Sequence, residues 1–266
     1  MSFEHIRFEV SDGVARLTLN KLPLNVLNIA MMREINTALE GLGDNPSVKV
    51  LVFEAAEGSK AFSAGVDVSE HTADKVREMI EVFHRIFRLL DRLEVPTVAV
   101  VDGAALGGGC ELVLFCDMVI ASERASFGQP EIQVGVLPPI AVIALPDIIG
   151  PKKAMEMVLI GDRIRAPEAL QLGLVNKVVP PEELRAAADE FVGKLAKLSG
   201  AVLRLTKRAV RMGEQGSRGA GEQRSRFAVG LAAVEELYLG LLMATEDANE
   251  GLAAFMEKRA PVWKDR

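Results

Sequence analysis

The sequence of 266 residues predicts an α/β fold with a helical C-terminal region. Short β-branched apolar runs alternate with glycine-containing turns and with segments of helical periodicity, which is typical of α/β proteins. These strand patterns stop after about Ala187, and the rest of the chain shows helical patterns only. We therefore expect an α/β core over residues 1–196 and a helical region over residues 197–266.

The first element that we expect is a β-hairpin. Residues 8–20 alternate apolar and polar side chains around Ser11-Asp12-Gly13, a tripeptide typical of a tight turn. Apolar positions in residues 73–93 recur at intervals of three and four, which predicts one long helix. Proline and acidic residues at 180–183 predict the start of another helix. Further strands are expected at the apolar runs 48–53, 98–101, 118–121 and 174–179.

The C-terminal region is expected to consist of successive helices over residues 194–259, with an exposed charged turn near residues 213–226. Apolar residues such as Leu231, Val234 and Leu237 would give these helices an apolar face. A region this small cannot bury such a face by itself. It should therefore pack either on the core of its own chain or against another subunit.

Composition excludes several classes of partner. The chain has 31 Lys and Arg against 37 Asp and Glu, a net charge of −6 and a pI of about 5.3. This balance gives no basic footprint for nucleic acid or for an anionic membrane surface. The most apolar stretch, residues 135–150, contains three prolines and one aspartate and is shorter than the roughly 20 residues of a membrane span. The N-terminus is charged from the fourth residue, so we expect no secretory signal and a soluble, cytoplasmic protein.

The cysteines and histidines point to neither a disulfide nor a metal. Cys110 and Cys116 are six residues apart in a helix-like segment, which turns them about 240° from each other and prevents a bond between them. The three histidines are scattered singly. No cluster has the spacing of metal ligands, so no metal site is expected.

A glycine-rich segment is the first candidate for a functional site. Gly107, Gly108 and Gly109 follow a predicted strand and lead directly into an apolar helix. Glycines let backbone N–H groups approach a ligand closely, and a helix N-terminus adds partial positive charge. This pattern indicates an anion or oxyanion site, although a close helix-to-strand turn would also explain it. No Gly-Lys-Ser/Thr follows, which disfavours a phosphate-binding loop.

Two glutamates accompany this segment. Glu111 lies one turn inside the apolar helix, where a carboxylate is costly unless it is paired or functional. Glu131 follows Gly128-Gln129-Pro130 and precedes another apolar run. Two such carboxylates beside one reactive position could share the acid and base roles of a reaction. A structural salt bridge for Glu111 and an exposed turn for Glu131 are the alternatives.

Spaced motifs then identify a family. They are Ser-Ala-Gly-Val-Asp at 63–67, Ala-Leu-Gly-Gly-Gly-Cys-Glu at 105–111, Phe-Gly-Gln-Pro-Glu at 127–131 and Leu-Gly-Leu-Val at 172–175. In this order, they make the chain resemble the enoyl-CoA hydratase (crotonase) family over essentially its whole length. The resemblance implies a spiral of ββα units with a C-terminal helical region that builds trimers, often paired into hexamers. It also implies acyl-CoA thioesters as substrates, with coenzyme A as part of the substrate and no separate cofactor.

The resemblance assigns roles to individual residues. The backbone N–H groups of Val66 and Gly108 correspond to the oxyanion hole for the thioester oxygen. Glu111 is implied to position and deprotonate the water that attacks the β-carbon, and Glu131 to supply the proton on the carbon side. Family members that only isomerise or hydrolyse commonly lack one of these two carboxylates. The presence of both favours hydration.

Further residues are implied to contact the substrate. Asn25 matches an early turn beside the CoA nucleotide, but Leu22 stands where a lysine is common, which removes one expected charge contact with the CoA phosphates. Phe255 and Lys258 match a C-terminal signature that contacts CoA, often across the subunit boundary. The full set of implied substrate and CoA contacts is Asn25, Ala64, Asp67, Phe255 and Lys258.

The segment after Glu131 departs from the family pattern. Where many hydratases have a glycine-rich stretch with polar ends, residues 135–145 carry prolines and bulky apolar side chains. We expect them to form a narrow, dry acyl pocket lined by Pro138, Ile140, Val142 and Ile143. The pairs Glu70-His71 and Tyr238-Leu239 and the run 242–263 resemble cyclohexa-1,5-diene-1-carbonyl-CoA hydratases of anaerobic benzoyl-CoA degradation. The resemblance implies 6-hydroxycyclohex-1-ene-1-carbonyl-CoA as the product.

Other functions remain open at this point. Within enzymes, the alternatives are a general short-chain enoyl-CoA hydratase and a double-bond isomerase that uses Glu131 alone. A non-catalytic acyl-CoA-binding or RNA-binding relative would keep the same fold. The acidic pI and the paired carboxylates both count against a non-catalytic relative.

Overall fold

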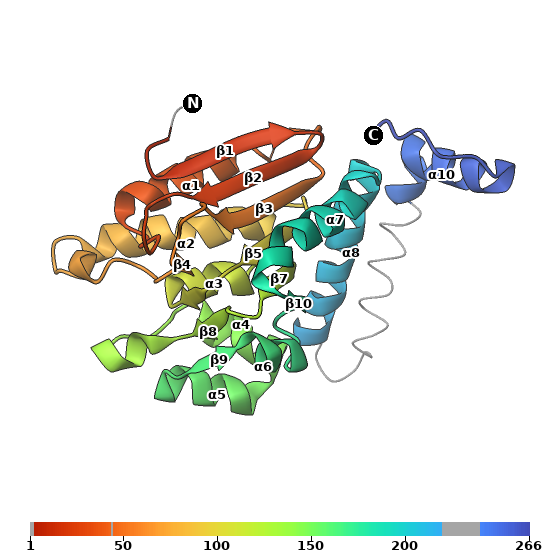
Figure 1. Ribbon diagram of the computed structural model, residues 1–266. Coiled ribbons are helices and arrows are strands. Elements are labelled where there is room, and N and C mark those ends of the chain that lie inside the picture. Colours follow the sequence, from red (N-terminus) through yellow and green to blue (C-terminus); the bar gives the residue numbers. More distant parts are fainter. Residues whose placement is uncertain (1–2, 44, 220–239) are drawn as a thin grey trace.

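The computed structural model describes residues 3–43, 45–219 and 240–266 and is built around two β-sheets (Figure 1). The strands are β1 (Ile6–Ser11), β2 (Val14–Leu19), β3 (Val50–Ala55), β4 (Ala61–Ser63), β5 (Thr97–Val101), β6 (Ala104–Leu106), β7 (Met118–Ser122), β8 (Ser126–Gly128), β9 (Arg163–Arg165) and β10 (Lys177–Val179). One sheet has the order β1-β2-β3-β5-β7-β10, and the other has the order β4-β6-β8-β9.

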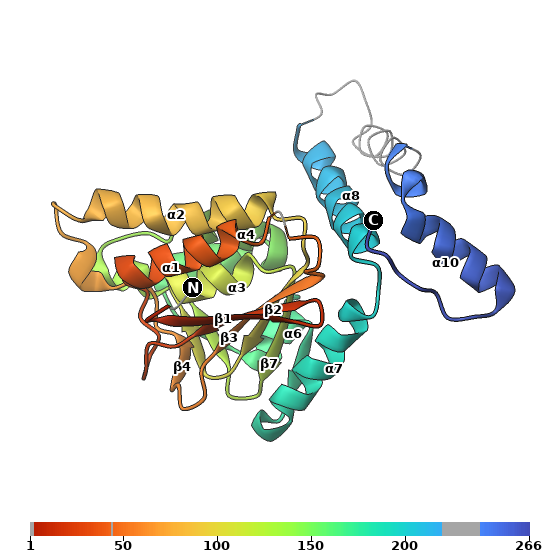
Figure 2. The ribbon, with the colours of Figure 1, turned by 90° about the horizontal axis from the view of Figure 1, so that it is seen from above.

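The helices separate and cover these sheets. The α-helices are α1 (Ile29–Glu40), α2 (Val76–Arg92), α3 (Gly108–Leu114), α4 (Ala141–Ile149), α5 (Pro151–Ile160), α6 (Ala166–Gln171), α7 (Leu184–Ala196), α8 (Gly200–Gly219) and α10 (Glu246–Glu257). Short 3₁₀ helices are η1 (Val68–Glu70), η2 (Pro130–Val134), η3 (Pro181–Glu183) and η4 (Leu242–Ala244). Helices α1 and α2 lie side by side on one face of the larger sheet, and α7 lies on the other face (Figure 2).

The chain repeats one unit: a strand of the larger sheet, a strand of the smaller sheet, and a helix. The first turn is β3, β4 and α2, and the second is β5, β6 and α3. The third begins with β7 and β8 and continues through η2 into α4. Within each sheet, the strands that follow one another in this spiral pair in parallel. The smaller sheet therefore stacks the ends of β4, β6 and β8, and the loops that follow these strands come together.

Strand alternation explains both faces of the larger sheet. Leu51 and Phe53 of β3 point into the main core with α1 and α2, whereas Val50 and Val52 point to the opposite face. That second face is covered by apolar side chains of α7. The sheet is buried on both sides, as parallel strands require.

Most predicted elements are confirmed, with some differences. The hairpin is present as an antiparallel β1–β2 pair, and the long helix is α2. Helices α1, α4, α5 and α6 and the strands of the smaller sheet are additional to the predicted elements. The expected charged turn at 213–226 is wrong in its first part, because α8 continues to Gly219. A glycine inside a helix costs only about 1 kcal/mol, which the upstream anchors of α8 can offset. The rest of that turn, residues 220–226, lies outside the described residues, and so do Leu231, Val234 and Leu237.

Helix α8 is tied to the core by buried polar contacts. The Lys207 ammonium donates to the backbone oxygen of Val95 at 2.8 Å and pairs with Asp117 Oδ2 at 2.7 Å. Beyond α8, the buried Asp247 of α10 accepts bonds from the backbone N–H groups of Lys264 and Asp265 at 2.6 and 2.8 Å. The C-terminal tail is therefore fastened to α10. Both α8 and α10 lie beside the core rather than within it (Figure 2).

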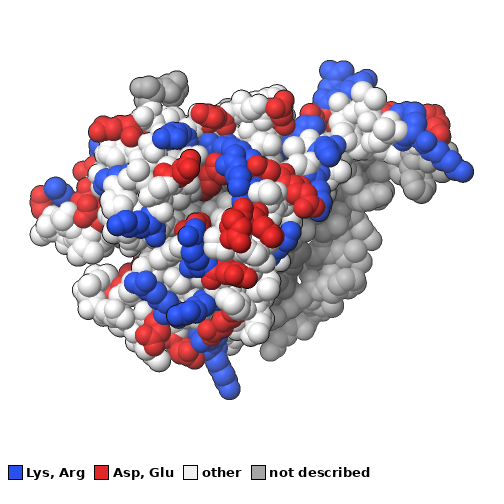
Figure 3. Space-filling model, viewed as in Figure 1, with Lys and Arg blue, Asp and Glu red and all other residues white. Residues whose placement is uncertain are grey.

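Acidic and basic side chains are interspersed over the described part of the face shown in Figure 3, without a broad area of one sign. Among the described residues, no helix is both long enough and apolar enough to cross a membrane. The same residues contain no group of three His, Cys, Asp or Glu side chains placed to hold a metal ion.

Candidate active site

Glu111 is buried at the first turn of α3, directly after β6. Glu111 is only 1% exposed, and its Oε1 accepts hydrogen bonds from the backbone N–H groups of Ile140 and Ala141 at 2.8 and 2.9 Å. Burial raises the pKa of this carboxyl to about 7, the two amide bonds oppose the rise, and the nearby charge of Glu131 adds to it. Within the described residues, no Lys or Arg pairs with Glu111, so the salt-bridge alternative is not supported.

Glu131 reaches the same turn of α3 from η2. A Cβ built on Gly107 would lie 2.6 Å from Glu131 Oε1, so the carboxyl packs directly against this glycine. Its Oε2 is buried, and no described residue forms a hydrogen bond with it. Burial raises the pKa of Glu131 to about 6. A surface turn therefore does not describe Glu131, because its reactive end points inward.

The two carboxyls form a pair that titrates near neutral pH. A glutamate in water loses its proton near pH 4.3, whereas burial and mutual repulsion keep a proton on this pair up to pH 6 to 7. Because the groups interact, the proton belongs to the pair rather than to one residue. At neutral pH the site can offer both an acid and a base.

The glycine loop leaves backbone donors beside this pair. Gly107 has φ of +51°, which L side chains rarely adopt, and a Cβ on Gly108 would lie 2.7 Å from Val66 Cγ2. The segments that carry Val66 and Gly108 are thus in contact. In the part of the chain that the structure describes, neither of these two backbone N–H groups donates to a protein acceptor. No described protein acceptor therefore occupies either predicted oxyanion donor, and their role stays a prediction.

Asn25 has a different role from the predicted one. It is fully buried, and its Nδ2 donates to Ser59 Oγ and to the backbone oxygens of Ala61 and Phe62 at 3.0 to 3.2 Å. Its Oδ1 accepts from the N–H of Lys21 at 2.9 Å. A fully engaged, buried amide has no donor left for CoA. The expected direct contact is corrected to a brace that holds the strand leading to the Val66 loop.

Ala64 and Asp67 flank the Val66 loop. The N–H of Ala64 donates to the backbone oxygen of Leu24 at 2.9 Å. Asp67 Oδ1 accepts bonds from the hydroxyl and the N–H of Ser69 at 2.7 and 3.0 Å, and these bonds lower the pKa of Asp67. Both residues are half-buried next to the oxyanion donors. Contact with CoA remains a prediction for each of them.

The predicted C-terminal contacts lie elsewhere in the chain. Phe255 belongs to α10, its side chain is outside the described residues, and Lys258 follows that helix as an exposed residue. Figures 1 and 2 both place α10 well apart from α3. Lys258 therefore does not lie near Glu111 and Glu131 of the same chain.

The predicted acyl-pocket residues divide into two groups. Pro138 is buried, and Ile140 is half-buried with its N–H on Glu111, so this part of the segment is at the site. In contrast, Val142 and Ile143 are 43% and 67% exposed on the outer side of α4. Their assignment to the pocket wall remains a prediction that nothing in the described packing supports.

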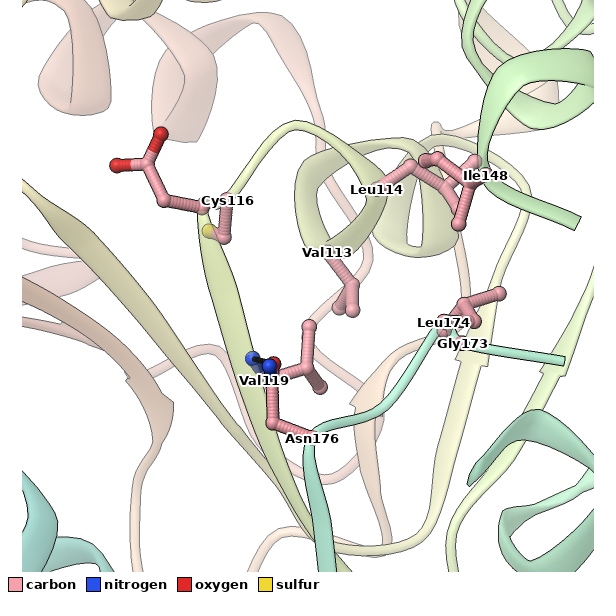
Figure 4. A pocket seen from close by; sticks show the side chains of 9 residues that line it. Val113, Leu114, Cys116, Val119, Ile148, Gly173, Leu174 and Asn176 are labelled. Atoms are coloured by element: carbon pink, nitrogen blue, oxygen red, sulfur yellow. Dashed lines mark hydrogen bonds between the residues drawn. The ribbon is translucent and has the colours of Figure 1, made fainter. Parts of the chain in front are cut away.

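A separate cavity of about 140 Å³ lies at the other end of α3 (Figure 4). It is lined by Val113, Leu114, Cys116, Asp117, Val119, Ile148, Gly173, Leu174 and Asn176. Neither Glu111 nor Glu131 is among these residues, so the cavity is distinct from the carboxylate site. Cys110 and Cys116 are both free thiols, which confirms that they do not form a disulfide with each other.

Two features of the site were not predicted from the sequence. The first is the pair of N–H groups at the start of α4 that hold Glu111, which carries no side-chain signature. The second is Gln129, which is fully buried beside Glu131. Its position between Gly128 and Pro130, within a motif that already contained Glu131, was the available signal.

Comparison with known proteins identifies the family. The family model for enoyl-CoA hydratase/isomerase matches residues 9–266. The chain is 36% identical over 264 residues to a crotonyl-CoA hydratase of Syntrophomonas wolfei, and 34% identical over 264 residues to a short-chain-enoyl-CoA hydratase of Clostridium acetobutylicum. Each alignment covers 97% of both proteins.

Solved structures agree with this assignment. The crystal structure of an enoyl-CoA hydratase from Bacillus anthracis superimposes with a TM-score of 0.90 at 33% identity, over 99% of this chain and 100% of that one. The predicted fold, a crotonase-type α/β spiral followed by C-terminal helices, is confirmed by this match and by the two mainly parallel sheets. The chain therefore belongs to the enoyl-CoA hydratase/isomerase family of enzymes.

Proposed function

We propose that this protein is a hydro-lyase that adds water to the conjugated double bond of an enoyl-CoA thioester. The observation that carries the proposal is the pair of buried carboxyls, Glu111 and Glu131, whose pKa values lie near neutrality beside two unused backbone donors. Hydration needs a base for water, an acid for carbon and a site for the charge that develops on the thioester oxygen.

The backbone donors stabilise that charge. The thioester oxygen would accept hydrogen bonds from the N–H groups of Val66 and Gly108 as electron density moves from the double bond to the oxygen. Each such preorganised donor contributes about 3 kcal/mol to the stability of a transition state. Enolate formation is therefore favoured only in the geometry that this loop defines.

The carboxyls divide the proton transfers. Glu111 Oε1 is held by two backbone amides, which leaves Oε2 to take a proton from water as the water oxygen bonds to the β-carbon. Glu131 then gives its proton to carbon. The proton that Glu111 took from water afterwards moves to Glu131, which restores the starting protonation of the pair. Because the pKa of Glu111 is about 7 and that of Glu131 about 6, the shared proton resides more on Glu111, and its return to Glu131 for the next turnover costs about 1.4 kcal/mol.

We further propose a cyclic conjugated acyl group, with cyclohexa-1,5-diene-1-carbonyl-CoA as the substrate. The support is the apolar segment that starts at Pro138 and supplies the N–H of Ile140 to the base. In this substrate the hydroxyl adds to the β-carbon and the proton adds to the far end of the diene. The product is 6-hydroxycyclohex-1-ene-1-carbonyl-CoA, which places the enzyme in anaerobic degradation of aromatic compounds. The names of the relatives favour the alternative of a general short-chain enoyl-CoA hydratase.

A spectrophotometric comparison of three thioesters tests both levels of the proposal. Purified protein is assayed with cyclohexa-1,5-diene-1-carbonyl-CoA, crotonyl-CoA and a 3-enoyl-CoA. Hydration of either conjugated thioester supports the hydratase function, and a higher kcat/KM for the cyclic diene supports the finer assignment. Conversion of the 3-enoyl-CoA alone would instead establish an isomerase.

We also propose that the protein acts as a homotrimer or a dimer of trimers. Helix α10 lies apart from α3 in its own chain, which supports contact of Phe255 and Lys258 with a CoA bound in the site of another copy. The division into a core, residues 1–196, and a C-terminal assembly region, residues 197–266, belongs to this proposal.

A further inference from the structure

Gln129 is a buried amide without a partner. The residue is 0% exposed and precedes η2, and in the described structure neither its Oε1 nor its Nε2 forms a hydrogen bond. A buried polar group left unsatisfied costs about 1–3 kcal/mol, and buried amides are nearly always bonded. A function of this glutamine would explain why the structure tolerates this cost.

A nearby glutamate has a buried acceptor without a donor. Glu131 lies two residues further along the same turn, and its Oε2 is buried with no partner in the described chain. A carboxylate oxygen only accepts hydrogen bonds, whereas the Gln129 Nε2 offers two donors. The unused donor and the unused acceptor thus lie two residues apart.

Both side chains also approach the first turn of α3. Glu131 packs against Gly107, and the amide of Gln129 lies beside the Cys110 thiol, whose pKa this contact lowers. Burial raises the pKa of Cys110, and the charges of Glu111 and Glu131 raise it further. Glu111 and Cys110 thus lie close enough to Glu131 for its charge to shift their pKa values, and Gln129 lies beside Cys110. Of these three, only Gln129 carries N–H donors.

We propose that Gln129 is a positioning residue for the hydration reaction: its Nε2 donates a hydrogen bond to Glu131 Oε2, directly or through one water molecule, and fixes the orientation in which Glu131 transfers its proton. This proposal rests on the proposed function. A glutamine suits this role because its neutral amide orients the carboxyl without adding the charge of a lysine, which would hold Glu131 deprotonated.

The first test compares Gln129→Leu with Gln133→Leu. Gln133 lies within η2 and is exposed, and its Nε2 donates to the backbone oxygen of Gly161 at 3.4 Å. With the thioester that the wild-type enzyme hydrates, we expect Gln129→Leu to lower kcat about tenfold and to change KM less than about twofold, which corresponds to one lost transition-state hydrogen bond. Gln133→Leu should match the wild type.

Thermal unfolding separates this effect from a folding defect. Gln129→Leu loses the proposed bond to Glu131 but also removes a buried amide oxygen that has no partner in the described structure, so its Tm should stay close to that of the wild type. An unchanged kcat, or a rise in KM alone, would overturn the positioning role. A lower Tm with an unchanged kcat would show that the amide is only structural.

The second test needs no substrate and therefore stands apart from the proposed function. The carboxyl carbons of ¹³C-labelled glutamates are titrated by NMR, and the Glu131 signal is identified by its loss in Glu131→Gln. Removal of a donor to a carboxylate raises its pKa, so the Glu131 midpoint should rise by roughly 0.7 pH unit in Gln129→Leu, and it should not change in Gln133→Leu. Equal midpoints in all three proteins would overturn the proposal, even if the wild type hydrates enoyl-CoA. A shifted midpoint in a protein that hydrates nothing would retain the contact and remove the proposed function.

Discussion

Glu111 shows how a single residue can be recognised from sequence while its partners are not. Its place inside an apolar helix predicts a buried carboxylate, and the structure places it there. The groups that hold it are the backbone N–H groups of Ile140 and Ala141, which any residue other than proline can provide. The pattern of side chains in a sequence cannot predict such backbone contacts. The same limit applies to Asn25: its motif predicts a CoA contact but does not reveal the backbone oxygens that its amide binds.

Replacement of either glutamate should remove hydration. We expect Glu111→Gln and Glu131→Gln each to lower kcat at least ~100-fold with little change in acyl-CoA affinity, since each variant loses a general acid or base. Steady-state kinetics with the hydrated thioester give kcat, and calorimetry gives the affinity. Near wild-type hydration by Glu111→Gln would remove that residue from the mechanism. A loss with Glu131→Gln only would favour an isomerase.

Glu111→Gln should also change how stability depends on pH. Burial raises the pKa of the folded-state carboxyl from 4.5 to about 7, so the wild type is favoured by this group below pH 4.5 and loses that contribution as pH rises through 7. The Gln side chain keeps an oxygen for both amides and does not titrate. The unfolding free energy of the variant relative to the wild type should therefore increase by about 3 kcal/mol between pH 4.5 and pH 8.

Urea denaturation at several pH values measures this difference. The exposed Glu57→Gln provides the control and should follow the wild type at every pH. A constant difference between Glu111→Gln and the wild type would show that the buried carboxyl does not resist ionisation.

Gly107 permits the position of Glu131. In Gly107→Ala the new Cβ would lie 2.6 Å from Glu131 Oε1, so the carboxyl must move, and we expect kcat to fall at least about tenfold. Gly58→Ala is the matched control, because Gly58 also has a positive φ but has nothing within 4 Å of the new Cβ. Both variants should lose about 1–3 kcal/mol of stability from backbone strain. Equal kcat values in the two variants would contradict the contact between Gly107 and Glu131.

At the scale of elements, predictability follows length and periodicity. Helix α2 repeats its apolar positions over several turns, and the hairpin alternates on both sides of a tight turn, so each carries its own signal. The strands of the smaller sheet have three residues each, and three residues cannot display a period. The spiral stacks β4, β6 and β8 in parallel, and β9 pairs antiparallel with β8 at the edge. Helix α1 did carry a signal in its Asn28 N-cap, which accepts from Met31 N–H at 3.0 Å, and the following apolar positions.

A buried ion pair is one of the contacts that attach α8 to the core. Lys207 is 8% exposed and binds both Asp117 and the backbone oxygen of Val95. Lys207→Met would leave Asp117 partly buried without this partner, so we expect the free energy of unfolding in urea to fall by about 3 kcal/mol. Lys194→Met, which removes an exposed pair with Glu190, should cost less than about 1 kcal/mol. Equal losses would show that the buried pair does not anchor the helix.

At the scale of the whole molecule, the C-terminal region carries predicted CoA contacts that lie far from the carboxyls of the same chain. The core carries both carboxyls, the oxyanion donors and the predicted contacts Ala64 and Asp67, whereas the predicted CoA contacts Phe255 and Lys258 lie on or after α10. A sequence reveals the motif of such a contact but not which copy supplies it, because linear order does not specify distance. The folded chain limits the choice, since it places α10 apart from α3 (Figures 1 and 2).

Assembly and site sharing can be tested together. Light scattering should give three or six times the chain mass of 28.7 kDa, and a monomer at micromolar concentration would contradict both the trimer and the shared site. Lys258→Ala should raise KM for the acyl-CoA, and Glu111→Gln should abolish turnover. When the two variants are unfolded, mixed and refolded together, some sites will combine the intact carboxyls of one chain with the Lys258 of its neighbour. Random mixing makes this roughly a quarter of all sites, so activity at low substrate concentration should exceed the sum of the separate variants. Activity equal to that sum, in a confirmed oligomer, would place Lys258 outside the neighbour's site.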